Sequence, residues 1–454
     1  MEKNILKFYW YRLTKFGLFH IAIMVLFYQQ RGLSFSQIMV LQSFYYFAKV
    51  LSEVPTGALA DRFGRKKSLV IGSFCHSSAY LLIFLSHSFI LFNVGEIIAG
   101  IAMSFAYGAD SALAYDTLKD LGREKEYQKV EGNGHSMRLL SFAIFAPIGG
   151  LLATVNLALP YLASSVVIFL SGLIGLTLIE PRKEASKCKV ENSEKPGGKE
   201  KLECSPLGEP NESSLSIIES QVPLKRDTPA RLFPSSFFQK SQVSRNYYHE
   251  IGRSFNLVLR EKRILWLVLF FSLVFLATRL GFWTYQPYMK EVGVPLSLFG
   301  VVFASFHLFA ALVSKYADKI EKTLKENLTL LLMPILVVIS FILMSRFFFL
   351  WSLCFILLQQ VSMATHEPIL KNYLNRYTTS DVRATMLSVQ SMAGNLVFAL
   401  TAPFLGKLVD KLHLENALLI FALVIIIFSI VLWYYRRRWF TKSKSLSSQE
   451  RDLG

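Results

Sequence analysis

The chain has 454 residues, of which 52% are hydrophobic, 14% aromatic and only 18% charged. Soluble domains seldom have this composition, and because a membrane-spanning helix needs roughly 20 apolar residues, the chain has room for about a dozen of them. The formal net charge of +17 does not indicate a nucleic-acid partner, since the cytoplasmic loops of multispanning proteins collect Lys and Arg, which set their orientation. The composition therefore predicts an all-α integral membrane protein.

The motifs of catalytic and metal sites are missing from the sequence. The four cysteines, Cys75, Cys188, Cys204 and Cys354, form no CxxC pair, so we expect neither a zinc site nor a disulfide framework. GxSxG, Walker and HExxH motifs are also absent. We therefore expect no enzyme activity, no cofactor and no metal site.

Twelve apolar segments are long enough to cross a bilayer, and they fall into two groups of six. Their approximate bounds are 10–29, 36–58, 69–87, 90–113, 135–156, 160–180, 263–288, 297–315, 327–345, 349–370, 384–407 and 415–435. The first segment is the most polar, because it contains Arg12, Lys15 and His20. We expect Arg12 and Lys15 to extend along the helix to the membrane edge, where their charges reach water. The alternative is that they face a water-filled cavity.

Basic residues concentrate in alternate connections between the apolar segments. They are Lys3, Lys7, Arg12 and Lys15 at the start, Lys119, Arg123, Lys125, Lys129 and Arg138 between segments four and five, Lys315, Lys319, Lys322 and Lys325 after segment eight, Lys371, Arg376 and Arg383 after segment ten, and Arg436, Arg437 and Arg438 at the end. An excess of Lys and Arg marks the cytoplasmic side. We therefore predict a multi-pass protein of the cell membrane with both termini in the cytoplasm.

A polar stretch separates the two groups of segments. Residues 183–246 are rich in Ser, Glu, Lys and Pro, a composition typical of a disordered cytoplasmic linker. Residues 247–262 repeat apolar side chains at helical spacing, which predicts an amphipathic helix on the cytoplasmic surface. The expected domains are an N-terminal six-helix bundle over 1–182, the linker, the surface helix, a C-terminal six-helix bundle over 263–438 and a cytoplasmic tail over 439–454.

A charged turn connects the second and third segments. It reads GALADRFGRKK from Gly57 to Lys67, and its basic residues place it in the cytoplasm. The turn resembles the signature G-x-x-x-D-R-x-G-R-[RK] of the major facilitator superfamily, and every defining position matches. These positions are Gly57, Asp61, Arg62, Gly64, Arg65 and Lys66.

This resemblance covers nearly the whole chain apart from the linker. It implies the fold of the superfamily, two six-helix bundles around a central cavity, and transport by alternating access. In the family the turn packs against the start of span eleven and latches one conformation, so the resemblance gives Asp61 and its neighbours a role in a cytoplasmic gate. Asp61 could instead simply cap the turn. Arg138 and Arg383 are candidate ionic partners of Asp61 on this side.

Glu53, Glu96 and Arg279 are charged residues inside apolar segments, where a charge at the helix centre costs about 2.5–3.5 kcal/mol. Glu53 lies roughly 12 Å along its helix from Asp61 and is either a candidate proton carrier or a structural residue beside Pro55. Glu96 and Arg279 lie at similar depth in segments four and seven, which line the cavity in the family. We expect them to pair there, and a purely structural salt bridge is the alternative.

Acidic residues mark the ends of segments four and ten. Asp110 and Asp116 lie where segment four leaves the membrane, and Glu367 lies at the corresponding end of segment ten. We expect Asp110 and Asp116 to contact Arg138 or Arg123 in a gate. Solvated helix ends are the simpler alternative.

The resemblance implies a secondary active transporter, which we expect to be a monomer that acts on a small-molecule substrate in the lipid bilayer, with a proton as coupling ion. Exporters of the family commonly have R-x-x-x-G in span four, where this chain has Glu96 and Gly100, and APIGG at 146–150 matches the span-five antiporter motif G-P-x-x-G-G only in part. Proton-coupled efflux is the first expectation. Proton-coupled uptake of a metabolite, and a non-transporting membrane sensor or assembly protein that kept the fold, are the alternatives.

Overall fold

The computed structural model describes residues 2–106, 108–181, 188–190, 202–204, 258–377 and 383–449. The chain divides into two compact units, Met1–Glu180 with Ser244–Gly454 as the first and Pro181–Val243 as the second. The first unit contains every helix of the described residues, and it is the part of the molecule that carries the candidate site.

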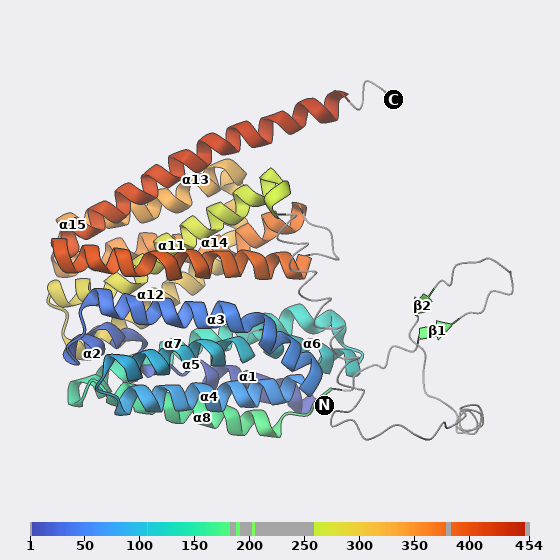
Figure 1. Ribbon diagram of the computed structural model, residues 1–454, viewed down its shortest axis with the longest axis horizontal. Helices are drawn as coiled ribbons and strands as arrows, with labels where there is room; N and C mark the ends of the chain where they lie inside the picture. The colour runs from blue at the N-terminus through green and yellow to red at the C-terminus, as the bar shows by residue number, and fades with distance from the viewer. Residues whose placement is uncertain are drawn as a thin grey trace, which may run out of the picture. The chain divides into compact units, whose positions relative to one another are not determined.

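The N-terminal half of the first unit contains helices that follow six of the predicted segments (Figure 1). They are α1 (Glu2–Lys15), a 3-10 turn (Phe19–Ala22), α2 (Met24–Gln30), α3 (Phe35–Phe63), α4 (Arg65–Leu85), α5 (Phe89–Ala106), α6 (Ala109–Asp120), a 3-10 turn (Glu124–Glu126), α7 (Tyr127–Val155) and α8 (Leu159–Thr177). Ser34 begins α3 with a capping box, because its hydroxyl accepts a hydrogen bond from Gln37 N while Gln37 Oε1 accepts one from Ser34 N. Apolar periodicity and local caps thus account for where these helices form.

The C-terminal half contains helices that follow the other six predicted segments (Figure 1). They are α11 (Lys262–Glu291), α12 (Leu296–Lys315), α13 (Ala317–Arg346), a 3-10 turn (Leu350–Phe355), α14 (Ile356–Tyr377) and α15 (Arg383–Gln449). Two of them are broken at a residue with positive φ, Lys325 in α13 (φ 62°) and His413 in α15 (φ 61°). Since side chains other than glycine rarely adopt this backbone conformation, each residue divides its helix into two segments. The two parts of α15 correspond to the predicted segments 384–407 and 415–435.

In the described part of the chain, eight helices are long and apolar enough to cross a membrane, and the count is nine if the bent pair of α1 and α2 forms one span. One of the eight, Met386–Trp439, contains the break at His413 and has 54 residues, enough for two spans. Helices α3 and α14 have 29 and 22 residues, but polar side chains such as Lys49 and Glu367 lower their hydropathy. The all-helical membrane fold is therefore confirmed, and the prediction of twelve spans is confirmed in part.

The two halves of the first unit pack against each other mainly through α7 with α12 and α3 with α15. A Cβ atom built on Gly300 would lie 1.9 Å from the carbonyl oxygen of Ala146, and one built on Gly150 would lie 2.9 Å from Gly300 N. Gly406 approaches the backbone of Ser36 in the same way. Small residues therefore let helices of opposite halves meet backbone to backbone.

Polar side chains also join the halves. The Asp410 carboxylate of α15 accepts hydrogen bonds from Phe35 N (2.9 Å) and Ser36 N (2.8 Å) at the start of α3. Gln286 of α11 accepts a hydrogen bond from Val25 N at 2.8 Å. A carboxylate of one half thus caps a helix of the other, where the unpaired amides and the helix dipole favour negative charge.

The second unit contains one short antiparallel pair among the described residues, β1 (Cys188–Val190) with β2 (Leu202–Cys204). The rest of the predicted linker lies outside the described residues. The same holds for the predicted amphipathic helix at 247–262 up to residue 257, and residues 258–260 are helical.

Candidate functional site

The signature turn joins α3 to α4 at Gly64, whose φ of 104° is a conformation that favours glycine. A Cβ atom at this position would lie 2.9 Å from the carboxyl carbon of Glu180. The Glu180 carboxylate accepts hydrogen bonds from Arg65 N (2.6 Å) and Lys66 N (2.8 Å). A carboxylate just beyond α8 therefore caps the N-terminus of α4, and the close approach requires glycine at position 64.

Arg65 connects this turn to α6. Its Nη1 donates a hydrogen bond to the carbonyl oxygen of Ala112 at 2.5 Å and forms an ion pair with Asp116. Asp116 therefore contacts the signature turn, and the predicted contact with Arg138 or Arg123 is wrong. Arg123 instead donates two hydrogen bonds to Glu126 at 2.7 Å each.

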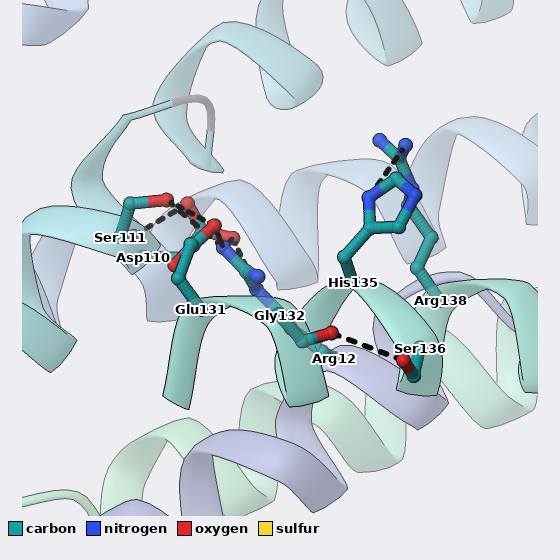
Figure 2. Close-up of polar contacts among 8 residues, drawn as sticks. All are labelled: Arg12, Asp110, Ser111, Glu131, Gly132, His135, Ser136 and Arg138. Atoms are coloured by element: carbon teal, nitrogen blue, oxygen red, sulfur yellow. Dashed lines mark hydrogen bonds and ion pairs between the residues drawn. The ribbon is translucent and has the colours of Figure 1, made fainter. Parts of the chain in front are cut away.

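Asp110, the other acidic residue at the end of segment four, binds Arg12 (Figure 2). Arg12 Nε donates to Asp110 Oδ2 at 2.9 Å, and Arg12 Nη2 donates to Glu131 Oε1 and Ser111 Oγ at 2.9 Å each. The three charged residues come from α1, α6 and α7. Asp110 was also expected to contact Arg138 or Arg123, and this expectation is wrong because Arg12 takes its place.

The charges of the first segment are buried inside the protein. The Arg12 side chain is 7% exposed. Lys15 is 1% exposed and donates a hydrogen bond from Nζ to the carbonyl oxygen of Gly72 at 3.0 Å. The expectation that both side chains extend to water is wrong, since each finds an internal partner on another helix.

The remaining gate residues lie apart from this network. Gly57 lies one helical turn before Asp61 in α3, and Asp61 and Arg62 are exposed in its last turn. Arg138 Nη2 contacts His135 Nδ1 at 3.2 Å (Figure 2), so Arg138 does not pair with Asp61. Arg383 is the first residue of α15, and its side chain lies outside the described part.

Glu96 is 6% exposed within α5. Its Oε1 accepts a hydrogen bond at 2.7 Å from the hydroxyl of Tyr28, which comes from α2. Arg279 of α11 is half-buried, and its guanidinium carbon lies 5.0 Å from the centroid of the Phe275 ring. The predicted Glu96–Arg279 pair is therefore not formed in this conformation.

Five charged side chains from both halves interact electrostatically around Lys49 of α3. They are Lys49, Glu53 on the same helix, Arg138 of α7, Arg279 of α11 and Glu367 of α14. We call these five residues the central charge cluster. Sequence reasoning singled out four of them but missed Lys49, although Lys49 precedes Glu53 by four residues and therefore lies on the same helical face.

Comparison with known proteins agrees with the fold. A family profile described as Major Facilitator Superfamily matches residues 13–402. The chain is 23% identical over 421 residues to the uncharacterised MFS-type transporter YxaM of Bacillus subtilis (strain 168), with 90% of each chain covered.

Two solved structures are similar at low sequence identity. A bacterial homologue of the human lysosomal transporter Spinster, in an inward-facing and occupied conformation, has a TM-score of 0.68 at 12% identity and covers 96% of this chain and 97% of its own. The nucleoside transporter NupG has a TM-score of 0.67 at 11% identity, with 95% and 98% covered. The likeness of these structures agrees with the fold, and the family profile, which matches most of the chain, shows that the chain belongs to the major facilitator superfamily of membrane transporters.

Proposed function

We propose that this transporter is a secondary active carrier that moves a small organic solute between its two halves by alternating access, coupled to protons. The observation that carries the proposal is the central charge cluster, because its residues come from both halves. Charges inside a membrane protein are costly and tend to line substrate or ion pathways. A solute held by residues of both halves would be exposed to either side as the halves rock.

Glu96 is the proposed proton-binding residue, with Glu53 as the second candidate. Glu96 is buried and bound to Tyr28, whereas Glu53 is half-buried and one of its carboxyl oxygens, Oε2, makes no hydrogen bond in the described part of the chain. A proton on such a group changes the relative free energy of two conformations only if they bind it with different affinity. Rocking of the halves would change the surroundings of Glu53, because it interacts with Lys49, which in turn interacts with Arg279 and Glu367 of the other half.

The signature turn is proposed to lie in the cytoplasm, as its Lys and Arg residues suggest. The end of the molecule where Asp410 caps α3 would then face outward, and its contacts between halves support an inward-facing state. Cysteine at Lys67 or Lys290, each in a chain free of other cysteines, tests this orientation. An impermeant maleimide should label intact cells at position 290 and should reach position 67 after lysis. The reverse pattern would refute it.

Transport itself is tested in proteoliposomes loaded with a panel of labelled organic anions, cations and neutral solutes. We expect a pH gradient to drive flux of at least one compound. The direction of the gradient that accelerates this flux distinguishes export from uptake. Export is the direction we propose first.

Glu96→Gln keeps a hydrogen-bond acceptor for Tyr28 but cannot exchange a proton, so its flux should lose most of its dependence on the pH gradient. Glu415→Gln, at an exposed position, is the matched control and should behave like the unaltered chain. An unchanged gradient dependence in Glu96→Gln would remove this residue as the coupling site. Absence of flux for the whole panel would count against the carrier function.

A further inference from the structure

Two arginines of the first unit form no ion pair with an acidic residue that the structure describes. Arg138 and Arg279 are both half-buried. In the part of the chain that the structure describes, no carboxylate oxygen lies within 4.0 Å of either guanidinium. Arg138 contacts His135 and lies over the Phe16 ring at 5.5 Å, and Arg279 lies over the Phe275 ring at 5.0 Å.

The two guanidinium groups come from opposite halves but act on the same neighbours. Lys49 and His307 each interact electrostatically with both Arg138 and Arg279. Phe142, which follows Arg138 by one helical turn, stacks on His307 with ring centroids 5.1 Å apart. This stack ties α7 to α12 beside the two arginines, so the groups converge on one region between the halves.

The charges of this region do not cancel. Lys49, Arg138 and Arg279 are cationic, whereas Glu53 and Glu367 are acidic, which leaves one positive charge in excess within the central charge cluster. Glu53 lies one turn from Lys49 on the same helix, a spacing that suits an ion pair. Without Lys49 and Glu53, the two guanidiniums and Glu367 still carry one positive charge in excess. A partly buried charge without a counter-ion is costly.

The surroundings of both arginines are aromatic. The Phe16 and Phe275 rings lie beneath the two guanidiniums, and Phe142 and Phe271 belong to the same aromatic contacts. All four rings are partly or fully buried. Such a lining would bury an apolar body next to a charged group.

We propose that the solute is a small organic anion with one carboxylate, bound jointly by Arg138 and Arg279, and with an apolar body packed on the neighbouring rings. This inference rests on the proposed carrier function and names its substrate class. A guanidinium binds a carboxylate through two parallel hydrogen bonds, which a neutral or cationic solute cannot replace. One negative charge matches the excess of the cluster, whereas a dianion would also meet Glu53 and Glu367.

The arrangement also couples binding to movement. Two like charges on opposite halves repel each other, so they oppose approach of the halves around an empty site. An anion between them replaces that repulsion with two attractions, and it therefore binds most tightly when the halves close. A ligand with this differential affinity shifts the conformational equilibrium toward the closed state.

The test measures binding to the purified full-length protein in detergent, independently of transport. The probes are monocarboxylates with aromatic or alkyl bodies, such as benzoate, phenylacetate and octanoate, each compared with its amide and with the corresponding amine. Inorganic phosphate is the dianionic probe. The readout is the shift in the thermal unfolding midpoint with probe concentration, since a ligand that binds the native state raises it. We expect at least one carboxylate to raise the midpoint while its amide and amine do not.

The variants Arg138→Gln and Arg279→Gln should each weaken that carboxylate at least about tenfold, which corresponds to roughly 1.4 kcal/mol. Arg279→Lys, which keeps the charge but loses the planar fork, should lose less. Arg346→Gln, at an exposed position at the end of α13, is the matched control and should bind normally. Because neither arginine forms an ion pair with a residue that the structure describes, the Gln variants should fold, and a cooperative unfolding transition verifies this.

Three results would overturn the inference: no midpoint shift with any carboxylate, stabilisation by amides, amines or phosphate in preference to carboxylates, or equal binding in both Gln variants. Binding without flux in proteoliposomes would instead refute the carrier function and leave the anion site standing. Flux of a neutral solute that neither arginine substitution changes would support the carrier function and refute the anion site.

Discussion

Arg12 neutralises two carboxylates of different helices. Its side chain is 7% exposed, and those of Asp110 and Glu131 are 15% and 33% exposed. Removing one partner of a buried ion pair leaves uncompensated charge and typically costs about 3–5 kcal/mol. We expect Arg12→Gln to lower the free energy of unfolding by roughly 3 kcal/mol, near the low end because Glu131 reaches some water.

The measurement is the unfolding midpoint of the purified protein in detergent. Arg123→Gln removes an arginine whose pair with Glu126 is 46% and 42% exposed, and it should lower the midpoint much less, because water screens an exposed pair. Equal losses for the two variants would show that the Arg12 network contributes no more than a surface pair.

At the same scale, the sequence predicts which residues are charged within the membrane but not what they bind. Hydropathy treats each segment as if it faced lipid, so the charges of Arg12 and Lys15 are assigned to the membrane edge. Their partners lie on other helices and are visible once those helices pack. Lys49 was missed for a related reason. A single lysine in an apolar stretch changes the hydropathy of the segment little, and its charged neighbours Arg279 and Glu367 belong to the opposite half of the chain.

Gly64 is the residue on which the turn between α3 and α4 depends. Its backbone conformation, with φ 104° and ψ 146°, would cost an alanine about 1–3 kcal/mol, and the new methyl group would displace the Glu180 carboxylate that caps α4. We expect Gly64→Ala to lower the unfolding free energy by roughly 2–4 kcal/mol, the sum of strain and a lost cap. Thermal unfolding measures this loss.

Glu180→Ala should remove the cap alone, at about 1 kcal/mol. The double variant should cost less than the sum of the two, since both changes break the same contact. Gly132→Ala is the control: nothing lies within 4 Å of its added Cβ atom in the interior of α7, so it should be neutral or stabilising. If the losses of unfolding free energy at positions 64 and 180 are fully additive, the effect of Gly64→Ala does not act through the Glu180 cap.

Element positions follow well from apolar periodicity. Helix α12 spans Leu296–Lys315 and α4 spans Arg65–Leu85, close to the predicted 297–315 and 69–87. Breaks are harder to predict. Gly108, with φ 82°, separates α5 from α6, and a glycine is a recognisable signal for such a break in the sequence. His413 breaks α15 with a positive φ although it is not a glycine. Such a residue adopts this conformation because the surrounding packing requires it.

At the scale of the whole molecule, Asp410 joins the two halves through the start of α3. Its carboxylate accepts two backbone hydrogen bonds from the opposite half, and hydrogen bonds to a charged group contribute about 1.5–3 kcal/mol each. Because rocking of the halves must break them, Asp410→Ala should shift the ratio of the two conformations at least about tenfold toward the state that is open at this end. Neither Asp410 nor this contact was predicted, since the residues are 375 and 374 positions apart in the chain.

Spin labels at Gln30 and Lys411, exposed positions on opposite halves near this contact, report the change as a distance distribution. In the unaltered chain the short distance should dominate, and in Asp410→Ala a longer distance should gain population. Glu415→Gln, an exposed acidic residue on the same helix, should leave the distribution unchanged. If Asp410→Ala also leaves it unchanged while transport is altered, the carboxylate affects the solute pathway and not the closure of the halves. If both the distance distribution and transport stay unchanged, the Asp410 contact forms when the halves close but does not stabilise the closed state. The packing of α7 on α12 through their glycines must then hold this end together.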